Sequence, residues 1–170
     1  MKNVVITGAT SFIGSKIVKK FSENNWNVYA IVRPNSTQID NLKGIENLTV
    51  IFLDMSEINL LKSKITKKIT LFYHIAWDGT RGESRNDYLR QKNNYANSIE
   101  AYAVAKSLNA DKFVSIGSQA EYGECVGPID ENYSPNPNTQ YGIYKLKTFL
   151  DINELSYKDN IGFFWGRIFS

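Results

Sequence analysis

Short runs of apolar residues alternate along the chain with segments whose apolar residues recur every three or four positions. Val4 to Ile6 form a β-branched run that ends at Gly8, and helical spacing follows from Phe12 to Phe21. Further apolar runs, each typical of a strand, cover residues 28–32, 48–53, 69–76, 112–116 and a segment that starts at 161. Helical segments are predicted between them, near 58–65, over 88–109 and from 141 onward.

This alternation of strands and helices predicts the fold class. Strand, helix, strand order requires right-handed crossovers, and these build a parallel sheet covered by helices. We therefore expect an α/β fold with a doubly wound parallel sheet and helices on both faces. The runs at 28–32 and 48–53 are continuously apolar, which predicts strands buried on two faces. Ligands of such sheets bind beyond the carboxyl ends of the strands.

Composition and charge exclude several classes of protein. The chain has 170 residues, 42% hydrophobic and 22% charged, which is ordinary for one globular domain. The formal net charge of +3 is mild, and Lys and Arg form no stripe interleaved with aromatics, so nucleic-acid binding is disfavoured. No apolar run approaches the ~18 residues of a membrane span, and the N-terminal run is too short for a signal peptide. The single cysteine, Cys125, excludes an intramolecular disulfide and multi-cysteine metal sites, so a cytoplasmic location is expected.

The segment from Thr7 to Gly14 lies where a dinucleotide-binding loop is required, directly after the first strand and at the start of the first helix. Gly8 permits a sharp turn and Gly14 permits close packing of helix on sheet. The helix N-terminus offers backbone amides and a positive dipole end to a pyrophosphate. Ser11 replaces the middle glycine, and its side chain either crowds the phosphates, caps the helix or bonds the anion. The residues predicted to contact the cofactor here are Gly8, Thr10, Ser11, Phe12, Ile13 and Gly14.

Tyr141 and Lys145 are four residues apart at the start of a helical segment, so their side chains share one face. A nearby cation favours the phenolate, which would let Tyr141 exchange a proton near neutral pH. Such pairs also occur on solvated helix faces without any chemical role. Ser118 lies upstream in a loop flanked by glycines.

With Ser118, the glycine loop and the Tyr/Lys pair together, the chain resembles the extended branch of the short-chain dehydrogenase/reductase superfamily, that is, the NAD(P)-dependent epimerase/dehydratase family. The resemblance covers essentially the whole chain. Four further segments agree with it: Asp54 after the third strand, His74-Ile75-Ala76-Trp77 after the fourth, Asn94 in the long helix, and residues 117–123 after the fifth. It implies a Rossmann-type NAD(P)-binding domain.

The resemblance also implies a role for individual residues. Tyr141 would be the acid/base at a sugar or ketone oxygen, Lys145 would hold the nicotinamide ribose and lower the pKa of the phenol, and Ser118 would hydrogen-bond the reacting oxygen. Asp54 would bind the exocyclic amine of adenine, and the backbone of Ala76 would line the ribose and nicotinamide channel. The remaining residues that it places around the cofactor are Met55, Trp77 and Asn94.

Arg33 ends the second strand, where NAD-preferring domains usually have an acidic residue for the adenine ribose. An arginine there, with Ser36 nearby, suits the extra phosphate of NADP through charge-assisted hydrogen bonds. The alternative is that Arg33 only stacks on adenine. NADP is therefore favoured over NAD.

The loop after Ser118 bears on the type of reaction. Family members that eliminate water resemble one another in having an Asp-Glu pair there, whereas this chain has Gln119-Ala120, so a dehydratase is disfavoured. We expect Glu121 to point away from the substrate. The leading interpretation is a nucleotide-sugar epimerase or oxidoreductase that moves hydride to and from nicotinamide. The alternatives are an NADPH-dependent keto-reductase on a 4-keto sugar or small ketone, and a non-catalytic dinucleotide-binding module.

Two further expectations concern His74 and the extent of the chain. His74 has no Cys, His or acidic residue at metal spacing, so we expect a structural role and no metal. Family members continue past residues 167–170 into a smaller C-terminal portion that grips the substrate, and this chain lacks that portion. We therefore expect residues 1–170 to bind dinucleotide but to turn over a nucleotide-linked sugar poorly. A homodimer through the two long helices is a further expectation, and Tyr88, Tyr95 and Tyr102 would serve either that interface or the core.

Overall fold

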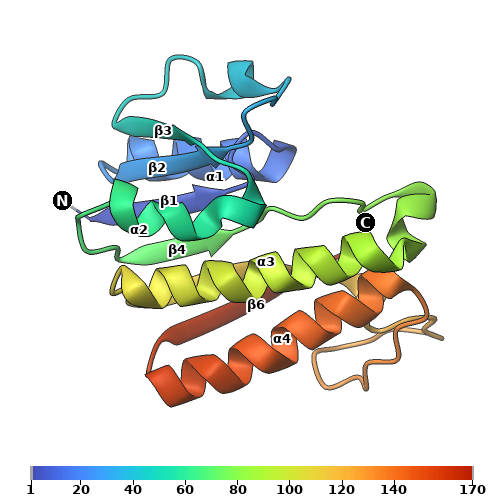
Figure 1. Ribbon diagram of the computed structural model, residues 1–170. Helices are drawn as coiled ribbons and strands as arrows, with labels where there is room; N and C mark the ends of the chain where they lie inside the picture. Colours follow the sequence, from blue (N-terminus) through green and yellow to red (C-terminus); the bar gives the residue numbers. More distant parts are fainter. Residues whose placement is uncertain (1, 170) are drawn as a thin grey trace.

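The computed structural model describes residues 2–169 and contains one six-stranded parallel sheet in the order β3-β2-β1-β4-β5-β6 (Figure 1). The strands are β1 Asn3–Thr7, β2 Asn27–Val32, β3 Leu48–Phe52, β4 Leu71–His74, β5 Lys112–Ser118 and β6 Gly162–Ile168. The α-helices are α1 Phe12–Glu23, α2 Leu61–Lys64, α3 Tyr88–Ser107 and α4 Gln140–Asp159. Four 3-10 helices are η1 Ile39–Leu42, η2 Met55–Leu60, η3 Gly82–Asn86 and η4 Gln119–Glu121. The chain reverses its direction of travel across the sheet at β1, as in a Rossmann fold, and the predicted fold class is confirmed.

Two apolar cores lie on opposite faces of the sheet, because successive side chains of a strand point to opposite sides. On one face Val5, Phe72 and Phe113 pack with residues from α2, α3 and α4. On the other face Val4 and Ile6 pack with residues from α1 and η1. Figure 1 shows α1 behind the sheet and α3 and α4 in front of it. Complete burial of each such side chain stabilises the fold by roughly 1.5–3 kcal/mol.

Three details of the strands differ from the sequence-based expectations. β3 is an edge strand, and Phe52 remains 56% exposed, so the expectation that this run is buried on two faces was wrong. β4 is shorter than predicted because the amides of Ile75 and Ala76 turn toward the hydroxyl of Thr7 instead of continuing the ladder. β5 continues past residue 116 to Ser118, which pairs with Ile168 of β6.

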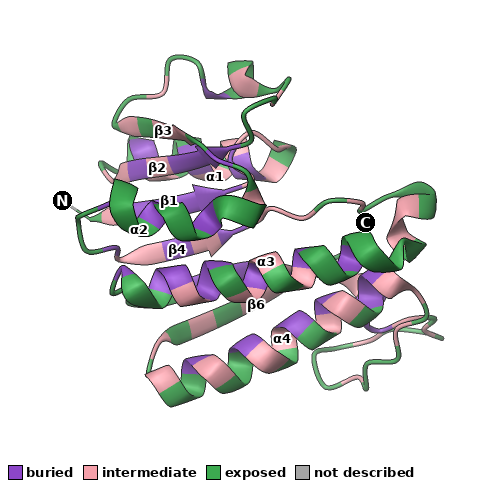
Figure 2. Ribbon diagram, in the orientation of Figure 1, coloured by how far each residue is buried: buried purple, intermediate pink, exposed green. Residues whose placement is uncertain are grey.

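The side chains of β6 are covered on one face of the sheet and exposed on the other. Phe163 and Trp165 pack on Phe149 of α4. The alternate residues Phe164 and Ile168 point to the face that carries α1, and there they are 61% and 38% exposed. The exposure of β6 contrasts with the buried central strands (Figure 2). The face of the sheet near β6 is therefore apolar and open in this chain.

The two long helices, α3 and α4, are joined by polar contacts as well as by packing. Tyr95 donates its hydroxyl hydrogen to Asp151 at 2.6 Å, and Tyr102 donates to Asp159 at 3.1 Å. These two tyrosines thus serve contacts within the chain, while Tyr88 remains half-exposed. None of the helices within residues 2–169 combines the length and the apolar character that crossing a membrane would require.

Candidate functional site

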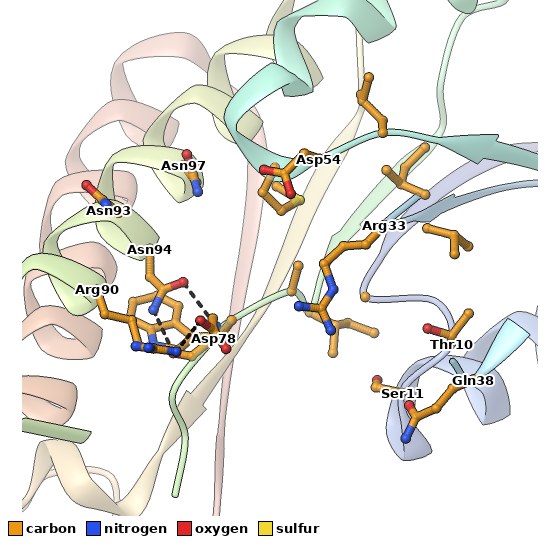
Figure 3. A pocket seen from close by; sticks show the side chains of 18 residues that line it. Thr10, Ser11, Arg33, Gln38, Asp54, Asp78, Arg90, Asn93, Asn94 and Asn97 are labelled. Carbon is orange, nitrogen blue, oxygen red and sulfur yellow. Dashed lines mark hydrogen bonds and ion pairs between the residues drawn. The ribbon is translucent and has the colours of Figure 1, made fainter. Parts of the chain in front are cut away.

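A pocket of about 350 Å³ lies beyond the carboxyl ends of β1, β2, β3 and β4 (Figure 3). This is the edge of the sheet where the strand order reverses and where ligands of doubly wound sheets bind. Its size is that of a small-molecule site. The residues that line it are Gly8, Thr10, Ser11, Ile31, Val32, Arg33, Gln38, Leu53, Asp54, Met55, Ile75, Ala76, Trp77, Asp78, Arg90, Asn93, Asn94 and Asn97.

The glycine turn, residues 8–14, forms the floor of this pocket and needs both of its glycines. Gly8 has a φ of +65°, and a Cβ atom on it would lie 2.9 Å from the backbone nitrogen of Ala76. A Cβ atom on Gly14 would lie 2.1 Å from the carbonyl oxygen of Gly8. Ser11 accepts a hydrogen bond from the amide of Gly14 at 3.0 Å and is the N-cap of α1. Of the alternatives for Ser11, capping of the helix is therefore realised.

These features fit a dinucleotide. The backbone at Gly8 is bare, and the first-turn amides of α1 at Phe12 and Ile13 have no acceptor one turn earlier in the helix. They are the donors that a pyrophosphate requires. Ile31 and Leu53 supply apolar walls on the side of β2 and β3.

Polar groups of three segments surround the mouth of the pocket near β2 and β3: the glycine turn, the loop after β2 and the segment after β3. Arg33 extends into the space between Asp54 and Thr10 (Figure 3). The hydroxyls of Thr10 and Ser36 are hydrogen-bonded at 3.1 Å, which ties the glycine turn to the loop after β2. The amide and hydroxyl of Ser56 donate to Asp54, and with the charge of Arg33 they hold the pKa of that carboxyl below its ordinary value. The mouth therefore carries one cation and one carboxylate.

His74 connects the end of β4 to α3 and has the structural role expected from the sequence. Thr7 accepts hydrogen bonds from the amides of Ile75 and Ala76, so its hydroxyl hydrogen is directed to Nδ1 of His74 at 2.9 Å. Ser98 donates to the carbonyl of Asn94, so it accepts from Nε2–H of His74 at 2.9 Å. Burial, together with the charge of Lys145, lowers the pKa of His74 to about 3, so the ring is neutral. Within residues 2–169, no three His, Cys, Asp or Glu side chains form a group that could hold a metal ion.

The loop after β4 is held by two amide side chains of α3. Asn94 bonds both backbone groups of Asp78, accepting from its amide at 3.0 Å and donating to its carbonyl at 2.7 Å. Gln91, which is fully buried, accepts from Nε1 of Trp77 at 2.7 Å and donates to the carbonyls of Gly79 and Ser84. These bonds fix the indole of Trp77 at the wall of the pocket.

Trp77 connects the pocket to the three residues predicted to be catalytic. Its ring lies 3.8 Å from Nζ of Lys145, a cation–π contact, and meets the ring of Tyr141 edge to face at 6.1 Å. Lys145 donates to the carbonyl of Ile116 at 2.6 Å. A hydrogen bond also joins the hydroxyls of Ser118 and Tyr141. The structure therefore brings Ser118, Tyr141 and Lys145 together beside the pocket.

The electrostatics of this group differ from the expectation that Lys145 lowers the pKa of Tyr141. Burial raises the pKa of Tyr141 above its ordinary value, against the opposing hydrogen bond of Ser118 and the charge of Arg85. Burial also lowers the pKa of Lys145 to about 7. The expectation was wrong, because the ammonium is directed to a carbonyl and is itself desolvated.

The residues predicted to contact the cofactor lie in three places. Gly8, Thr10, Ser11, Arg33, Asp54, Met55, Ala76, Trp77 and Asn94 line the pocket, while Phe12, Ile13, Gly14 and Ser36 lie in the segments that support it. Tyr141 and Lys145, also predicted to contact the cofactor, lie next to the pocket against Trp77. Asp78 also lines the pocket, as do four polar residues that the sequence-based expectations did not include: Gln38, Arg90, Asn93 and Asn97. A signal existed for the last three, because polar residues recur at helical spacing from Arg90 to Asn97 within a helix expected to be apolar on one face.

Comparison with known proteins agrees with this geometry. The model of the NAD dependent epimerase/dehydratase family matches residues 4–170. The chain is 27% identical over 143 residues to dTDP-6-deoxy-L-talose 4-dehydrogenase (NAD(+)) of Aggregatibacter actinomycetemcomitans, covering 84% of this chain and 51% of that protein. A UDP-N-acetylglucosamine 4-epimerase from Methanobrevibacter ruminantium, solved with UDP-N-acetylmuramic acid, superposes with a TM-score of 0.84 at 28% identity, over 96% of this chain and 53% of that one.

A further solved structure extends the likeness in fold. The UDP-Glc/GlcNAc 4-epimerase from Campylobacter jejuni superposes with a TM-score of 0.88 at 20% identity, over 98% of this chain and 53% of that chain. The chain spans about half the length of the curated relatives it matches. Its glycine turn after β1, its pocket at the switch point of the sheet and the match over residues 4–170 lead to one conclusion: the chain belongs to the NAD-dependent epimerase/dehydratase family.

Proposed function

We propose that the protein carrying these residues is a nucleotide-sugar 4-epimerase or oxidoreductase in which this domain binds the nicotinamide dinucleotide and supplies the acid/base. The observation that carries the proposal is the convergence of Ser118, Tyr141 and Lys145 beside the pocket. The names of the relatives support the class of substrate, because they act on or bind dTDP- and UDP-linked sugars.

The dinucleotide, when bound, supplies hydride exchange with a sugar carbon. Tyr141 takes or returns the proton of the sugar hydroxyl, and Ser118, bonded to the phenol, orients the reacting oxygen. Lys145, next to Trp77, would supply positive charge beside the nicotinamide. Because burial raises the pKa of Tyr141, its phenol is protonated at neutral pH, and the positive charge of a bound oxidised nicotinamide would favour loss of that proton.

A second candidate is one-way reduction of a keto sugar, favoured by the relative that is named a 4-dehydrogenase. An epimerase regenerates its cofactor and shows no net change in nicotinamide absorbance, whereas a reductase consumes reduced cofactor stoichiometrically. A non-catalytic dinucleotide-binding module is the third candidate, and it requires none of the three converging side chains.

The identity of the dinucleotide is part of the proposal. One relative is named as a dehydrogenase that uses NAD(+), and a UDP-glucuronic acid 4-epimerase from Bacillus cereus was solved in complex with NAD, which supports NAD. Arg33 in the mouth of the pocket, with Ser36 bonded to Thr10, supports acceptance of the phosphate of NADP. The comparisons lend NADP no support, so the preference for it rests on these side chains alone.

The open apolar strip on β6, formed by Phe164 and Ile168, supports a further part of the proposal. We propose that a C-terminal substrate-binding portion packs there in the whole protein, and that residues 1–170 alone bind dinucleotide without robust turnover. Dimerisation through α3 and α4 uses the half-exposed Tyr88 in this proposal, since Tyr95 and Tyr102 bond within the chain. Cytoplasmic location belongs to the same proposal.

Tyr141→Phe tests the central claim, with Tyr157→Phe on the exposed side of α4 as the matched control. In the complete reading frame, Tyr141→Phe lowers turnover of the nucleotide sugar by about 100-fold or more, the usual contribution of a general acid/base. Dinucleotide affinity, measured by fluorescence titration, changes by less than about 3-fold. If turnover also survived the substitution, the proposed mechanism would be wrong.

A further inference from the structure

Glu121 is a fully buried carboxylate in η4, one turn beyond the end of β5. Oε1 accepts hydrogen bonds from the amide of Ser118 at 2.8 Å and from Nε1 of Trp165 at 3.0 Å. Oε2 accepts from Nε of Arg167 at 2.6 Å, which forms a buried ion pair. An ionised carboxylate deep in a protein is retained only with such a set of donors.

The backbone of β5 is shaped to admit this carboxylate. A Cβ atom on Gly117 would lie 2.2 Å from Nε1 of Trp165 and 2.6 Å from Oε1 of Glu121. Only glycine at this position lets the indole and the carboxylate meet against the strand. The same strand end carries Ser118, and its Ile116 carbonyl accepts the hydrogen bond of Lys145. Carboxylate and ammonium are thus fixed to one short piece of backbone.

The ammonium group of Lys145 is buried among aromatic rings, which disfavours its charged form. Its Nζ lies 3.8 Å from the ring centroid of Trp77, 5.7 Å from that of Trp165 and 5.9 Å from that of Tyr141. Burial is the main influence on its pKa and lowers it to about 7, while the charge of Glu121 opposes that fall. Trp165 contacts both Lys145 and Glu121: its ring faces the ammonium, and its Nε1–H donates to the carboxylate.

The other titratable groups around Lys145 do not supply negative charge. His74 of β4 is neutral, and Tyr141 of α4 is protonated at neutral pH. Arg85 of η3 lies over the ring of Tyr141, and Arg167 of β6 is cationic and paired with Glu121. Among the described residues, Glu121 is therefore the carboxylate whose negative charge acts on this group, and both Glu121 and Lys145 contact Trp165.

We propose that Glu121 is a positioning residue for the proton-transfer group: its buried carboxylate, held by Arg167 and by the Trp165 that also contacts Lys145, favours the charged form of the Lys145 side chain against desolvation. The proposal deepens the proposed function and rests on it for its chemical meaning. Its direct consequence, the ionisation of Lys145, is measurable without cofactor or substrate.

The test is the titration of Lys145 by NMR of the chain labelled in the lysine side chains, with Lys145→Arg to assign the resonance. Glu121→Gln keeps an acceptor for Ser118 but removes the charge, and it lowers the pKa of Lys145 by about one unit. Glu124→Gln makes the same change on an exposed carboxylate of the same loop and leaves the titration in place. If the titration of Lys145 is unchanged in folded Glu121→Gln, the proposal is overturned.

In Glu121→Gln the buried Arg167 loses its partner, which can prevent folding. A second variant keeps the proposal testable in that case. The double variant Glu121→Gln, Arg167→Gln replaces the ion pair by a neutral hydrogen-bonded pair and also lowers the pKa of Lys145, because it removes the charge of Glu121. An unchanged or raised value would refute the proposal. Titration of the wild-type chain with NAD and NADP separates the two claims: absence of binding counts against the proposed function, and an unmoved lysine counts against the role of Glu121.

Discussion

The protonation of His74 offers a quantitative prediction, because it is the only histidine of the sequence and is neutral and buried. Its pKa is about 3 in the folded chain against an ordinary value of 6.5. Below pH 6.5 the unfolded chain binds a proton that the folded chain does not, so stability falls as the pH falls from about 6.5 to about 3. Between pH 7 and pH 4 this linkage removes about 3 kcal/mol from the free energy of unfolding.

The assay is urea unfolding at pH 7 and pH 4, followed by circular dichroism, for the wild-type chain and for His74→Gln. The variant is less stable at pH 7, since it disturbs the bonds to Thr7 and Ser98. Its additional loss at pH 4 is smaller than that of the wild type by about 3 kcal/mol, because the other titrating groups are common to both. Equal losses on acidification would show that His74 does not carry the linkage.

The glycine turn and the mouth of the pocket give two further predictions. Gly8→Ala and Gly44→Ala both impose alanine on a positive φ, of +65° and +71°, but only Gly8 faces backbone atoms, whereas Gly44 has open space. We expect Gly44→Ala to cost about 1 kcal/mol and Gly8→Ala at least about 2 kcal/mol more, with loss of dinucleotide binding in a fluorescence titration; equal costs would contradict the close approach to Ala76. We expect Arg33→Gln to lower the affinity for NADP about 10-fold and to leave the affinity for NAD unchanged. The control, Arg81→Gln at an exposed position, changes neither affinity. Equal weakening of both dinucleotides would favour the alternative that Arg33 stacks on adenine.

The local features of the cofactor pocket were predictable because each depends on a short stretch of sequence. A β-branched run that ends at Gly8, followed by helical spacing from Phe12, predicts strand, turn and helix, and this is what the structure contains. Parallel strands meet their ligands at the carboxyl end, so the positions of Arg33, Asp54 and Ala76 followed from the strand order. The Tyr141/Lys145 spacing likewise placed both side chains on one face of α4.

Tertiary packing decided the pKa values of Tyr141 and Lys145 and the exposure of the edge strands. Periodicity predicts that β3 and β6 are strands, but only the sheet order makes them edges, with Phe52 and Phe164 exposed. Spacing brings Tyr141 near Lys145, yet burial, which depends on Trp77 and Trp165 from distant segments, raises one pKa and lowers the other. The sequence by itself determined the order of elements and the residues at strand ends, because these depend on neighbours along the chain. Only the tertiary structure revealed that Glu121 is paired with Arg167 near the end of β5. Desolvation and charge–charge interactions depend on residues that are distant in sequence and packed together in the fold.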